Sequence, residues 1–326
     1  MNKKIVTLLL TACILFLNAC KKDSDVFVPD PGQVTGPDTN WVNSITSSMP
    51  ASIMKTNLLI DPYRDSFEVN ANYATINTSL GLQCIFPPNC CIDNLGVAVT
   101  GKVQVEIYVI KKKGDMVRMD KPTTSDGRLL VSGGEIFINL LKNGQPITLA
   151  PSAKVYLRYI DYPVSTQMKL FYGEIINIER FNWNINHDTT NLLAAFNQGY
   201  EISTKRLHWI NCDYFYDTTT SNRTKVQTEL PPNFTNANTY VYLVFNDMRA
   251  VMGMYGEPSV KKFISSTVPT GKAVTIVVLS KQGNDFYLGK QTVTTALSSG
   301  VSVNQNVSIT PLKTARADIL SFLANL

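Results

Sequence analysis

The stretch Lys102–Ile110 reads Lys-Val-Gln-Val-Glu-Ile-Tyr-Val-Ile. In an extended chain successive side chains point to opposite faces, so this order separates an apolar face from a polar one. The polar face begins with Lys102, Gln104 and Glu106. The apolar face consists of Val103, Val105, Ile107 and Val109. This period of two predicts a half-buried β-strand and favours a β fold.

Neighbouring stretches show the same period. Lys154–Ile160 has an apolar face made of Val155, Leu157 and Tyr159. Glu135–Leu141 is a further expected strand, and Asn143-Gly144 then leads into Gln145–Leu149. An Asn-Gly pair between two apolar runs is the strongest short signal for a β-hairpin.

The second half of the chain follows the same rule. Tyr240–Phe245 reads as a buried strand, and Ala273–Leu279 and Phe286–Val293 flank a turn at Gln282–Asp285. Val301–Ile309 is the last expected strand. The tail, residues 314–326, has helical spacing instead, with Thr314 as its expected cap and an apolar face of Ile319, Leu320 and Leu323.

Many short strands separated by turns predict an all-β fold: two antiparallel β-sandwich domains with a short C-terminal helix. Pro231, Pro232 and Asn233 mark the boundary between the domains. We expect a first domain over residues 51–232, a second, immunoglobulin-like domain over 233–313 and a helix over 314–326. The aromatic-rich extension 163–230 either completes the first sandwich or forms a layer between the two.

The N-terminus carries an export signal. Lys3 and Lys4 precede an apolar run, Ile5–Phe16, that is shorter than the roughly 20 residues a transmembrane helix needs. Ala19 then directly precedes Cys20, as in the lipobox of bacterial lipoproteins. That resemblance makes residues 1–19 a signal peptide and Cys20 the acylated residue. Several acyl chains attached at Cys20 would anchor the protein stably in the membrane, because each buried CH₂ contributes about 0.8 kcal/mol. The alternative is an ordinary secreted protein with a chance cysteine.

Residues 20–50 are expected to form a flexible tether. Lys21, Lys22 and the acidic residues after them resemble the export tag of Bacteroidota surface lipoproteins. Residues 28–50 are rich in Pro, Gly, Asn, Ser and Thr, which is linker composition. The expected location is the outer membrane, lipid-anchored and at the cell surface, with the periplasmic face as the alternative.

Composition limits the function classes. Charged residues make up 17% and aromatic residues 10% of the 326-residue chain, so it can bury a core. The net charge of +5 becomes 5 − 2 = +3 when Lys3 and Lys4 leave with the signal. Apart from Lys111–Lys113 the charge is spread out, whereas nucleic-acid binding needs a dense basic stripe. We therefore expect no nucleic acid, and no motif for a cofactor is present.

Four cysteines remain in the mature chain: Cys84, Cys90, Cys91 and Cys212. An oxidising compartment favours disulfides. Cys90 and Cys91 are adjacent, so a bond within this pair is disfavoured, whereas Cys84 with either of them would close a small loop. Four cysteines allow three pairings, and the sequence leaves the choice open.

A family resemblance covers roughly residues 66–160. Ile85-Phe86-Pro87-Pro88, Thr100-Gly101-Lys102-Val103 and Ser132-Gly133-Gly134 form a series that resembles a ZU5-type β-sandwich. The region Trp209–Phe215 with Tyr240–Phe245 is similar to the second half of uncharacterised Bacteroidota outer-membrane lipoproteins. The first resemblance implies an interaction scaffold by analogy of fold, and the second implies two β domains without assigned chemistry. The His-Phe-Ser cleavage motif of some ZU5 proteins is absent, because Asp188 follows His187 and Trp209 follows His208.

Candidate catalytic and metal residues are few. His208 and Cys212 are four apart and could pair as base and nucleophile, but a buried thiol is the expected state. Two His and no Cys-x-x-Cys argue against zinc, so no metal site is expected. The carboxylates of Asp188, Asp213 and Asp217 lie in expected loops and leave calcium binding as an alternative, although such residues are also common in ordinary turns.

The aromatic-rich middle is the expected place for ligand contact. Trp183 and Tyr172 would stack on a sugar if they were exposed, and Glu174 lies beside them. Carboxylates such as Glu179 and Glu201 keep a glycoside hydrolase open as an alternative.

The favoured function is that of a non-catalytic, lipid-anchored binding or scaffold protein. It would recognise a protein or a glycan while the membrane holds it through Cys20. The alternatives are an extracellular carbohydrate-active hydrolase and a structural subunit of an envelope assembly.

Overall fold

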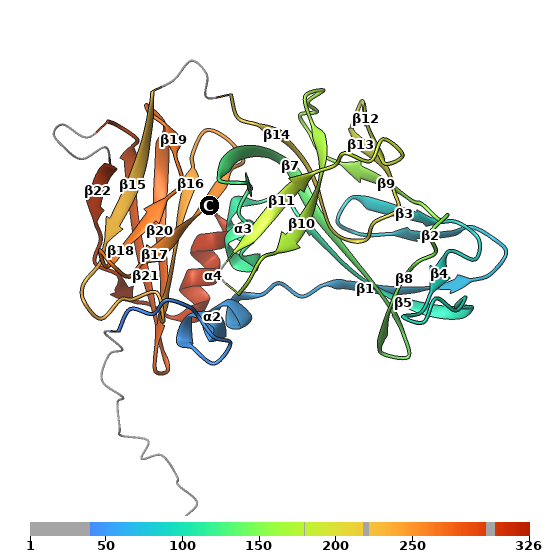
Figure 1. Cartoon of the computed structure of the whole chain (residues 1–326), viewed down its shortest axis with the longest axis horizontal. Helices are drawn as coiled ribbons and strands as arrows, with labels where there is room; N and C mark the ends of the chain where they lie inside the picture. Colours follow the sequence, from blue (N-terminus) through green and yellow to red (C-terminus); the bar gives the residue numbers. More distant parts are fainter. Residues whose placement is uncertain (1–39, 179, 218–221, 298–303) are drawn as a thin grey trace, which may run out of the picture. The chain divides into compact units, whose positions relative to one another are not determined.

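A computed structural model describes residues 40–178, 180–217, 222–297 and 304–326. Residues 37–326 form one compact unit. It contains three sheets and three short helices in its described part, so the prediction of an all-β sandwich fold with a C-terminal helix is confirmed (Figure 1). Cys20, the expected signal peptide and most of the expected tether lie outside the described residues.

The first sheet, called sheet I, has the strand order β1-β5-β7-β14-β10-β11, and β4, β6 and β8 pair at its margin. Its antiparallel pairs bring strands from residues 63–110 beside strands from 169–215. The bounds are β1 (Tyr63–Val69), β4 (Cys91–Ile92), β5 (Gly101–Ile110), β6 (Thr124–Ser125), β7 (Arg128–Lys142), β8 (Gln145–Leu149), β10 (Lys169–Ile175), β11 (Phe181–Ile185) and β14 (His208–Phe215).

Sheet II has five strands in the order β12-β13-β9-β3-β2. These strands are β2 (Ala74–Asn77), β3 (Leu82–Phe86), β9 (Val155–Ile160), β12 (Leu192–Phe196) and β13 (Gly199–Thr204). The inner faces of sheets I and II share one apolar core, which includes Val103, Val105, Ile107, Val155, Leu157 and Tyr159. The extension 163–230 therefore supplies strands to both sheets of the first sandwich, and its last strand, at residues 223–229, belongs to the third sheet.

Sheet III has the order β19-β15-β18-β17-β16-β20-β21-β23, and β22 pairs in parallel with β15. β15 precedes the expected boundary at Pro231, so the second group of strands begins earlier than the sequence indicates. Its strands surround their own apolar core. The bounds are β15 (Arg223–Glu229), β16 (Thr239–Phe245), β17 (Val251–Glu257), β18 (Lys262–Ser265), β19 (Val268–Pro269), β20 (Ala273–Gln282), β21 (Asp285–Thr294), β22 (Asn304–Ser308) and β23 (Leu312–Lys313).

Both expected hairpins are present. Lys142 pairs with Gln145, and the two turn residues Asn143 and Gly144 have φ values of 52° and 77°. Positive φ at both positions is the geometry that matches the twist of the flanking strands, and Asn-Gly adopts it readily. The second hairpin is tighter than expected, because Gln282 pairs directly with Asp285.

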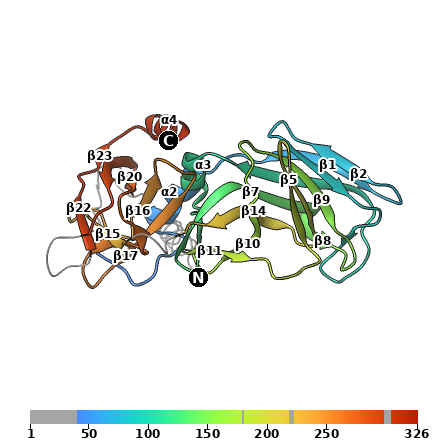
Figure 2. The same ribbon diagram turned by 90° about the horizontal axis from the view of Figure 1, so that it is seen from above.

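Three helices fill the junction between sheet I and sheet III (Figure 2). They are α2 (Pro50–Leu58), α3 (Lys113–Met119) and α4 (Arg316–Ala324). Ile319 and Leu323 of α4 are buried as predicted, whereas Thr314 does not cap the helix: the N-cap is Ala315, and the Thr314 hydroxyl donates to the carbonyl of Leu312. The helices share a core with Leu130, Phe171, Trp183, Trp209, Tyr242 and Val277.

Main-chain hydrogen bonds and an ion pair also cross this junction. The amide of Thr123 donates to the carbonyl of Val251 at 2.8 Å, and the amide of Ser132 donates to that of Arg249 at 2.9 Å. The guanidinium of Arg249 lies 3.0 Å from both carboxylate oxygens of Asp161. The first sandwich and sheet III are therefore joined by directional polar contacts in addition to the apolar core.

The folded part begins before residue 50, where the tether was expected to end. The ring of Trp41 lies 5.1 Å from that of Phe263, and Ile45 is buried. Val42 and Asn236 exchange two hydrogen bonds, at 3.0 and 2.7 Å. Residues 41–45 thus pack on sheet III. Within the described residues, no helix is long and apolar enough to cross a membrane.

Candidate binding surface

The ligand contacts expected in the aromatic-rich middle are wrong for two of three residues. Trp183 is 0% exposed, and its Nε1 donates to the carbonyl of Pro122 at 3.1 Å. Tyr172 is 2% exposed, with its hydroxyl 2.6 Å from that of Thr204. Both rings fill cores, as large aromatic side chains do when a second layer covers them. Glu174 is exposed and accepts a hydrogen bond from Asn184.

His208 and Cys212 do not form a catalytic pair. They lie on one strand, β14, whose register shifts between Asn211 and Asp213. The His208 ring is exposed and stacks on Phe137 at 5.7 Å, whereas the Cys212 thiol is fully buried in the core of the first sandwich. Burial raises the pKa of Cys212 well above its ordinary value, which disfavours the reactive thiolate.

The disulfide expected from Cys84 to Cys90 or Cys91 is not formed in the structure. All three residues, like Cys212, are free and buried. The sulfur atoms of Cys90 and Cys91 are 3.5 Å apart, and burial raises the pKa of Cys84 to about 12. These thiols contribute to the apolar core between sheets I and II.

Asp188 and Asp213, which were considered as possible calcium ligands, have other roles in the structure. Asp188 accepts hydrogen bonds from the amide of Thr190, at 2.8 Å, and from Asn191. That is ordinary turn geometry. Asp213 is fully buried on sheet I. Within the described ranges, no group of three His, Cys, Asp or Glu residues is arranged to hold a metal ion.

A buried acid pair lies on the outer face of sheet I, at the junction with sheet III. Glu135 pairs with Asn211 across β7 and β14, and Asp213 pairs with Ser132. Neither oxygen of Glu135 has a hydrogen-bond partner among the described residues, nor has Oδ1 of Asp213; Oδ2 of Asp213 accepts from Asn211 at 2.7 Å. The strand pattern alone did not indicate this pair, since a glutamate beside apolar residues reads as a solvent-facing position.

Burial dominates the electrostatics of this pair. It raises the pKa of Asp213 to about 8, against hydrogen bonds from Ser132 and Asn211 that favour the ionised form. It also raises the pKa of Glu135 well above the ordinary value, and the nearby Asp213 carboxylate adds to this shift while Lys121 opposes it. Burial outweighs the donors that Asp213 has, and neither oxygen of Glu135 has a donor among the described residues, so burial favours the protonated form of both carboxyls.

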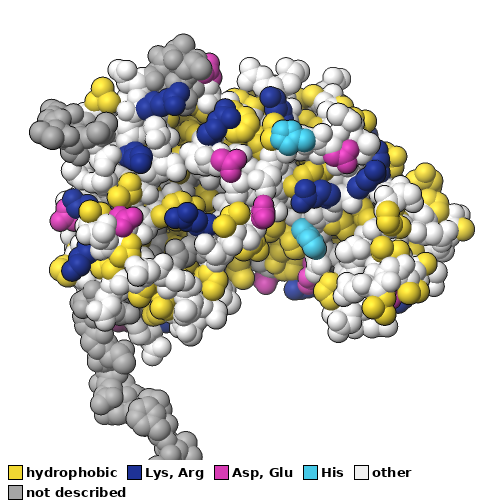
Figure 3. Space-filling view, viewed as in Figure 1, with side chains coloured by type: hydrophobic (Ala, Val, Ile, Leu, Met, Phe, Trp, Pro, Cys, Tyr) yellow, Lys and Arg dark blue, Asp and Glu magenta, His cyan; other side chains and the backbone are white. Residues whose placement is uncertain are grey.

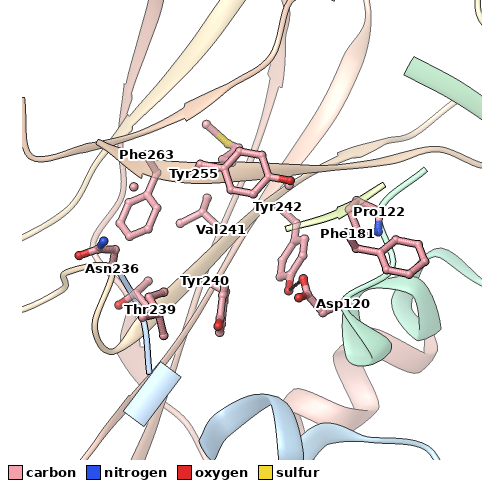
Figure 4. Close-up of a pocket in the computed structure, with 14 residues that line it drawn as sticks. Asp120, Pro122, Phe181, Asn236, Thr239, Tyr240, Val241, Tyr242, Tyr255 and Phe263 are labelled. Atoms are coloured by element: carbon pink, nitrogen blue, oxygen red, sulfur yellow. Dashed lines mark hydrogen bonds between the residues drawn. The ribbon is translucent and has the colours of Figure 1, made fainter. Parts of the chain in front are cut away.

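The cavity of Figure 4 is too small for an organic ligand. It lies between sheet III and the Asp120–Pro122 segment, and its volume is about 20 Å³. That is close to the space of one water molecule. The hydroxyl of Tyr242 donates to Asp120 at 2.7 Å, and the ammonium of Lys55 pairs with the same carboxylate. These groups tie α2 and the end of α3 to sheet III.

Two open grooves at the junction have larger volumes. One, of about 490 Å³, is lined by Lys111–Lys113, Arg249 and the C-terminal residue. Its lysines already serve main-chain carbonyls: Lys113 donates to Phe245 at 2.7 Å, and Lys111 donates to Ile160. The other, of about 410 Å³, contains Asp126, Arg180 and Tyr255. On the face shown in Figure 3, basic side chains alternate with acidic and hydrophobic ones and form no stripe.

The outer face of sheet II is accessible across all five strands, with most of its residues exposed and Gln83, Ile85 and Ser203 half-buried. The register places Thr75, Ile85, Tyr156, Ser203 and Leu192 side by side across the five strands. Tyr156 is 46% exposed and Leu192 is 58% exposed. The next row contains Asn77, Gln83, Arg158, Glu201 and Ala194. Large side chains that remain exposed on a regular sheet mark a surface available to a partner.

A groove of about 350 Å³ lies at one margin of this face. Tyr156 and Tyr73 line it together with Pro87, Pro88, Asn89, Ala150, Ser152, Ala153 and Lys154. None of the four pockets described above is lined by two Asp or Glu side chains, which is the arrangement a glycoside hydrolase requires.

No family model matches the chain, and no curated protein is similar to it.

Proposed function

We propose that this chain is a non-catalytic, lipid-anchored binding protein that presents the outer face of sheet II to a protein or glycan partner. The observation that carries the proposal is the exposure of this face, with Tyr156 and Leu192 unburied, while part of the outer face of sheet I lies beneath the helices and sheet III. The covered part of sheet I cannot meet a partner, which favours recognition by the outer face of sheet II.

The proposed cellular location rests on the N-terminal sequence. A lipobox ending at Cys20 anchors the chain in the outer membrane, and the Lys- and Asp-containing residues after it direct it to the cell surface. The residues after Cys20 have linker composition up to about Pro50, although Trp41 already packs on Phe263. We also propose the ZU5-type classification of residues 66–160, which the pairing of β1, β5 and β7 opposite β3 and β9 supports.

One experiment tests the proposed cellular location. Cys20→Ser removes the acylated residue, so the protein is expected to move from the membrane fraction to the soluble fraction. Protease treatment of intact cells is expected to degrade the wild-type protein. Persistence of the variant in the membrane fraction contradicts the anchor, and complete protection of the wild type places the protein on the periplasmic face.

A second experiment tests the binding surface. The soluble Cys20→Ser protein is labelled and its binding to intact cells is measured. Leu192→Asp, on β12 of sheet II, is expected to reduce cell binding about tenfold, because the partner would bury an unpaired carboxylate where an apolar side chain stood. Leu312→Asp is the matched control, since Leu312 is equally apolar and 69% exposed but lies on β23 of sheet III. Equal binding of both variants contradicts the assignment to sheet II.

A further inference from the structure

The groove beside sheet II has rigid walls. Pro87 and Pro88 fix the loop that follows β3, and Asn89 holds a left-handed conformation with φ 49°. The amide of Asn89 donates to the carbonyl of Asn70 at 2.8 Å, and the amide of Ala150 donates to that of Cys90 at 2.7 Å. These bonds fasten both sides of the groove to the first sandwich. A preformed groove loses little entropy when it is filled.

Two tyrosine rings lie in this groove and are accessible. Tyr73 is 66% exposed and directly precedes β2, while Tyr156 lies on the outer face of β9. Ala74 pairs with Phe86 and Tyr156 pairs with Ile85, so the two tyrosines come from neighbouring positions on either side of β3. Exposed aromatic rings offer flat apolar faces that carry a polar hydroxyl.

The charged groups around the groove are engaged with other protein groups. The ammonium of Lys154 donates to the carbonyl of Thr190 and interacts electrostatically with the Asp188 carboxylate, so its stem rather than its charge faces the groove. On the adjoining sheet face, Arg158 pairs with Glu201 at 3.6 Å. The polar groups left at the groove are the side-chain amide of Asn89 and the hydroxyls of Ser152 and the tyrosines. An ionic ligand would therefore find no complementary charge.

We propose that this groove binds an uncharged oligosaccharide, with the rings of Tyr73 and Tyr156 against the apolar faces of the sugars. Hydroxyl groups of the sugar suit the Asn89 amide and the Ser152 hydroxyl, which donate and accept hydrogen bonds without charge. The open shape admits a chain that passes through, and the volume lies in the range of small-molecule sites. The inference rests on the proposed binding function and names its ligand class.

Affinity gel electrophoresis of the Cys20→Ser protein tests this assignment. The gels contain one neutral polysaccharide each: xyloglucan, β-glucan, galactomannan, arabinoxylan or dextran. Polygalacturonate serves as an anionic comparison, and a soluble proline-rich peptide is tested by calorimetry because aromatic grooves also bind such chains. We expect at least one neutral polysaccharide to retard the protein, and polygalacturonate and the peptide to have no effect.

Matched variants locate the site. Tyr73→Ala and Tyr156→Ala are each expected to weaken the retardation about tenfold, a common cost of removing an aromatic contact. Tyr162→Ala is the control: Tyr162 is 81% exposed but lies six residues beyond Tyr156, about 20 Å along an extended chain. Since all three side chains are exposed, far-ultraviolet circular dichroism and unfolding midpoints should agree among them.

Three results overturn the proposal: no retardation by any neutral polysaccharide, retardation that the tyrosine variants leave unchanged, or binding of the proline-rich peptide in place of sugars. These results are separable from a failure of the proposed function. If sugars do not bind but Leu192→Asp still reduces cell binding, only the ligand class is wrong. If Leu192→Asp also has no effect, the binding surface itself is wrong.

Discussion

The outer face of sheet I is buried in part beneath a second layer, whereas the outer face of sheet II has no such cover and is exposed or half-buried across its five strands. Along β5 of sheet I, the outer face begins with exposed Lys102 and Gln104 and ends with Ile110, which is fully buried beneath the helices. Along β9 of sheet II, exposed and buried residues alternate to the end of the strand. Both faces belong to the same sandwich, so the difference comes from the layer that sheet III and the three helices add to one side only.

This difference shows where stability and recognition reside. On sheet I the outer face contributes to stability, and the cover encloses Glu135 and Asp213 without enough hydrogen-bond donors. On the outer face of sheet II the polar side chains can form hydrogen bonds with water, so they do not need donors from a covering layer. Substitutions on the two faces should therefore have opposite consequences: loss of stability on sheet I, and loss of binding with little loss of stability on sheet II.

Trp183→Ala should produce the largest effect on stability. The Trp183 ring is fully buried and meets the rings of Phe181 and Trp209 edge-on at 4.8 and 6.3 Å. Its removal leaves a large cavity, so the free energy of unfolding should fall by about 3–5 kcal/mol. Urea denaturation measures this change. Trp183 was expected to touch ligand, and a loss below about 1 kcal/mol would contradict its place in the junction core.

Arg249→Ala should have the next largest effect. Asp161 is 6% exposed, and Arg249 supplies both hydrogen bonds to its carboxylate across the junction. Burial raises the pKa of Asp161, and Arg249 opposes that shift. Since part of the Arg249 side chain is exposed, solvent screens the pair, and we expect a loss of about 2 kcal/mol.

The double variant is the control for Arg249→Ala. Asp161→Asn removes the charge that Arg249→Ala leaves buried, so the double variant should be more stable than Arg249→Ala alone. Additive losses, measured by urea denaturation of all four proteins, would show that the two side chains do not interact.

The positions of these strands in the sequence could be predicted, because a strand is indicated by the pattern of its own residues. The alternation in Val155–Ile160 and the apolar run in Thr239–Phe245 gave the right elements, since neither depends on distant residues. Helix α3 was missed because its seven residues include Gly114, a poor helix former. A Cβ at Gly114 would lie 1.7 Å from the carbonyl oxygen of Leu323, so the close approach of α3 and α4 requires this glycine.

The site could not be predicted in the same way, because exposure is decided by tertiary packing. Trp183 and Tyr156 are both aromatic residues on strands, yet one lies under sheet III and the other faces solvent. Glu135 carries the residue type of a surface position, yet it is fully buried. Exposed tyrosines become distinguishable from buried ones only when the order of strands and the covering layer are known.

The buried pair of Glu135 and Asp213 predicts how the free energy of unfolding depends on pH. The pKa of Asp213 is about 8 in the folded protein and near its ordinary value of 3.8 when unfolded. Between these values the folded state keeps a proton that the unfolded state releases. The free energy of unfolding should therefore fall as pH rises from about 4 to about 8, by at most about 1.4 kcal/mol per pH unit for this group.

Asp213→Asn should flatten this dependence. An amide resembles the protonated carboxyl and does not titrate, so the variant should lose less stability than the wild type between pH 5 and pH 8. Glu135→Gln should act in the same direction, because burial raises the pKa of Glu135 as well. Urea denaturation at a series of pH values measures both slopes. Parallel profiles for the wild type and Asp213→Asn would contradict a buried, protonated Asp213.

The smallest effect is expected on the exposed face. Arg158 and Glu201 pair at 3.6 Å across β9 and β13, and their side chains are 53% and 57% exposed. Water and salt screen such a pair, so Arg158→Ala should change the free energy of unfolding by less than about 0.5 kcal/mol. The same substitution leaves Glu201 without its partner beside the groove, and cell binding should change more than stability does. A loss of stability comparable with that of Arg249→Ala would mean that sheet II, like sheet I, is covered in the complete protein.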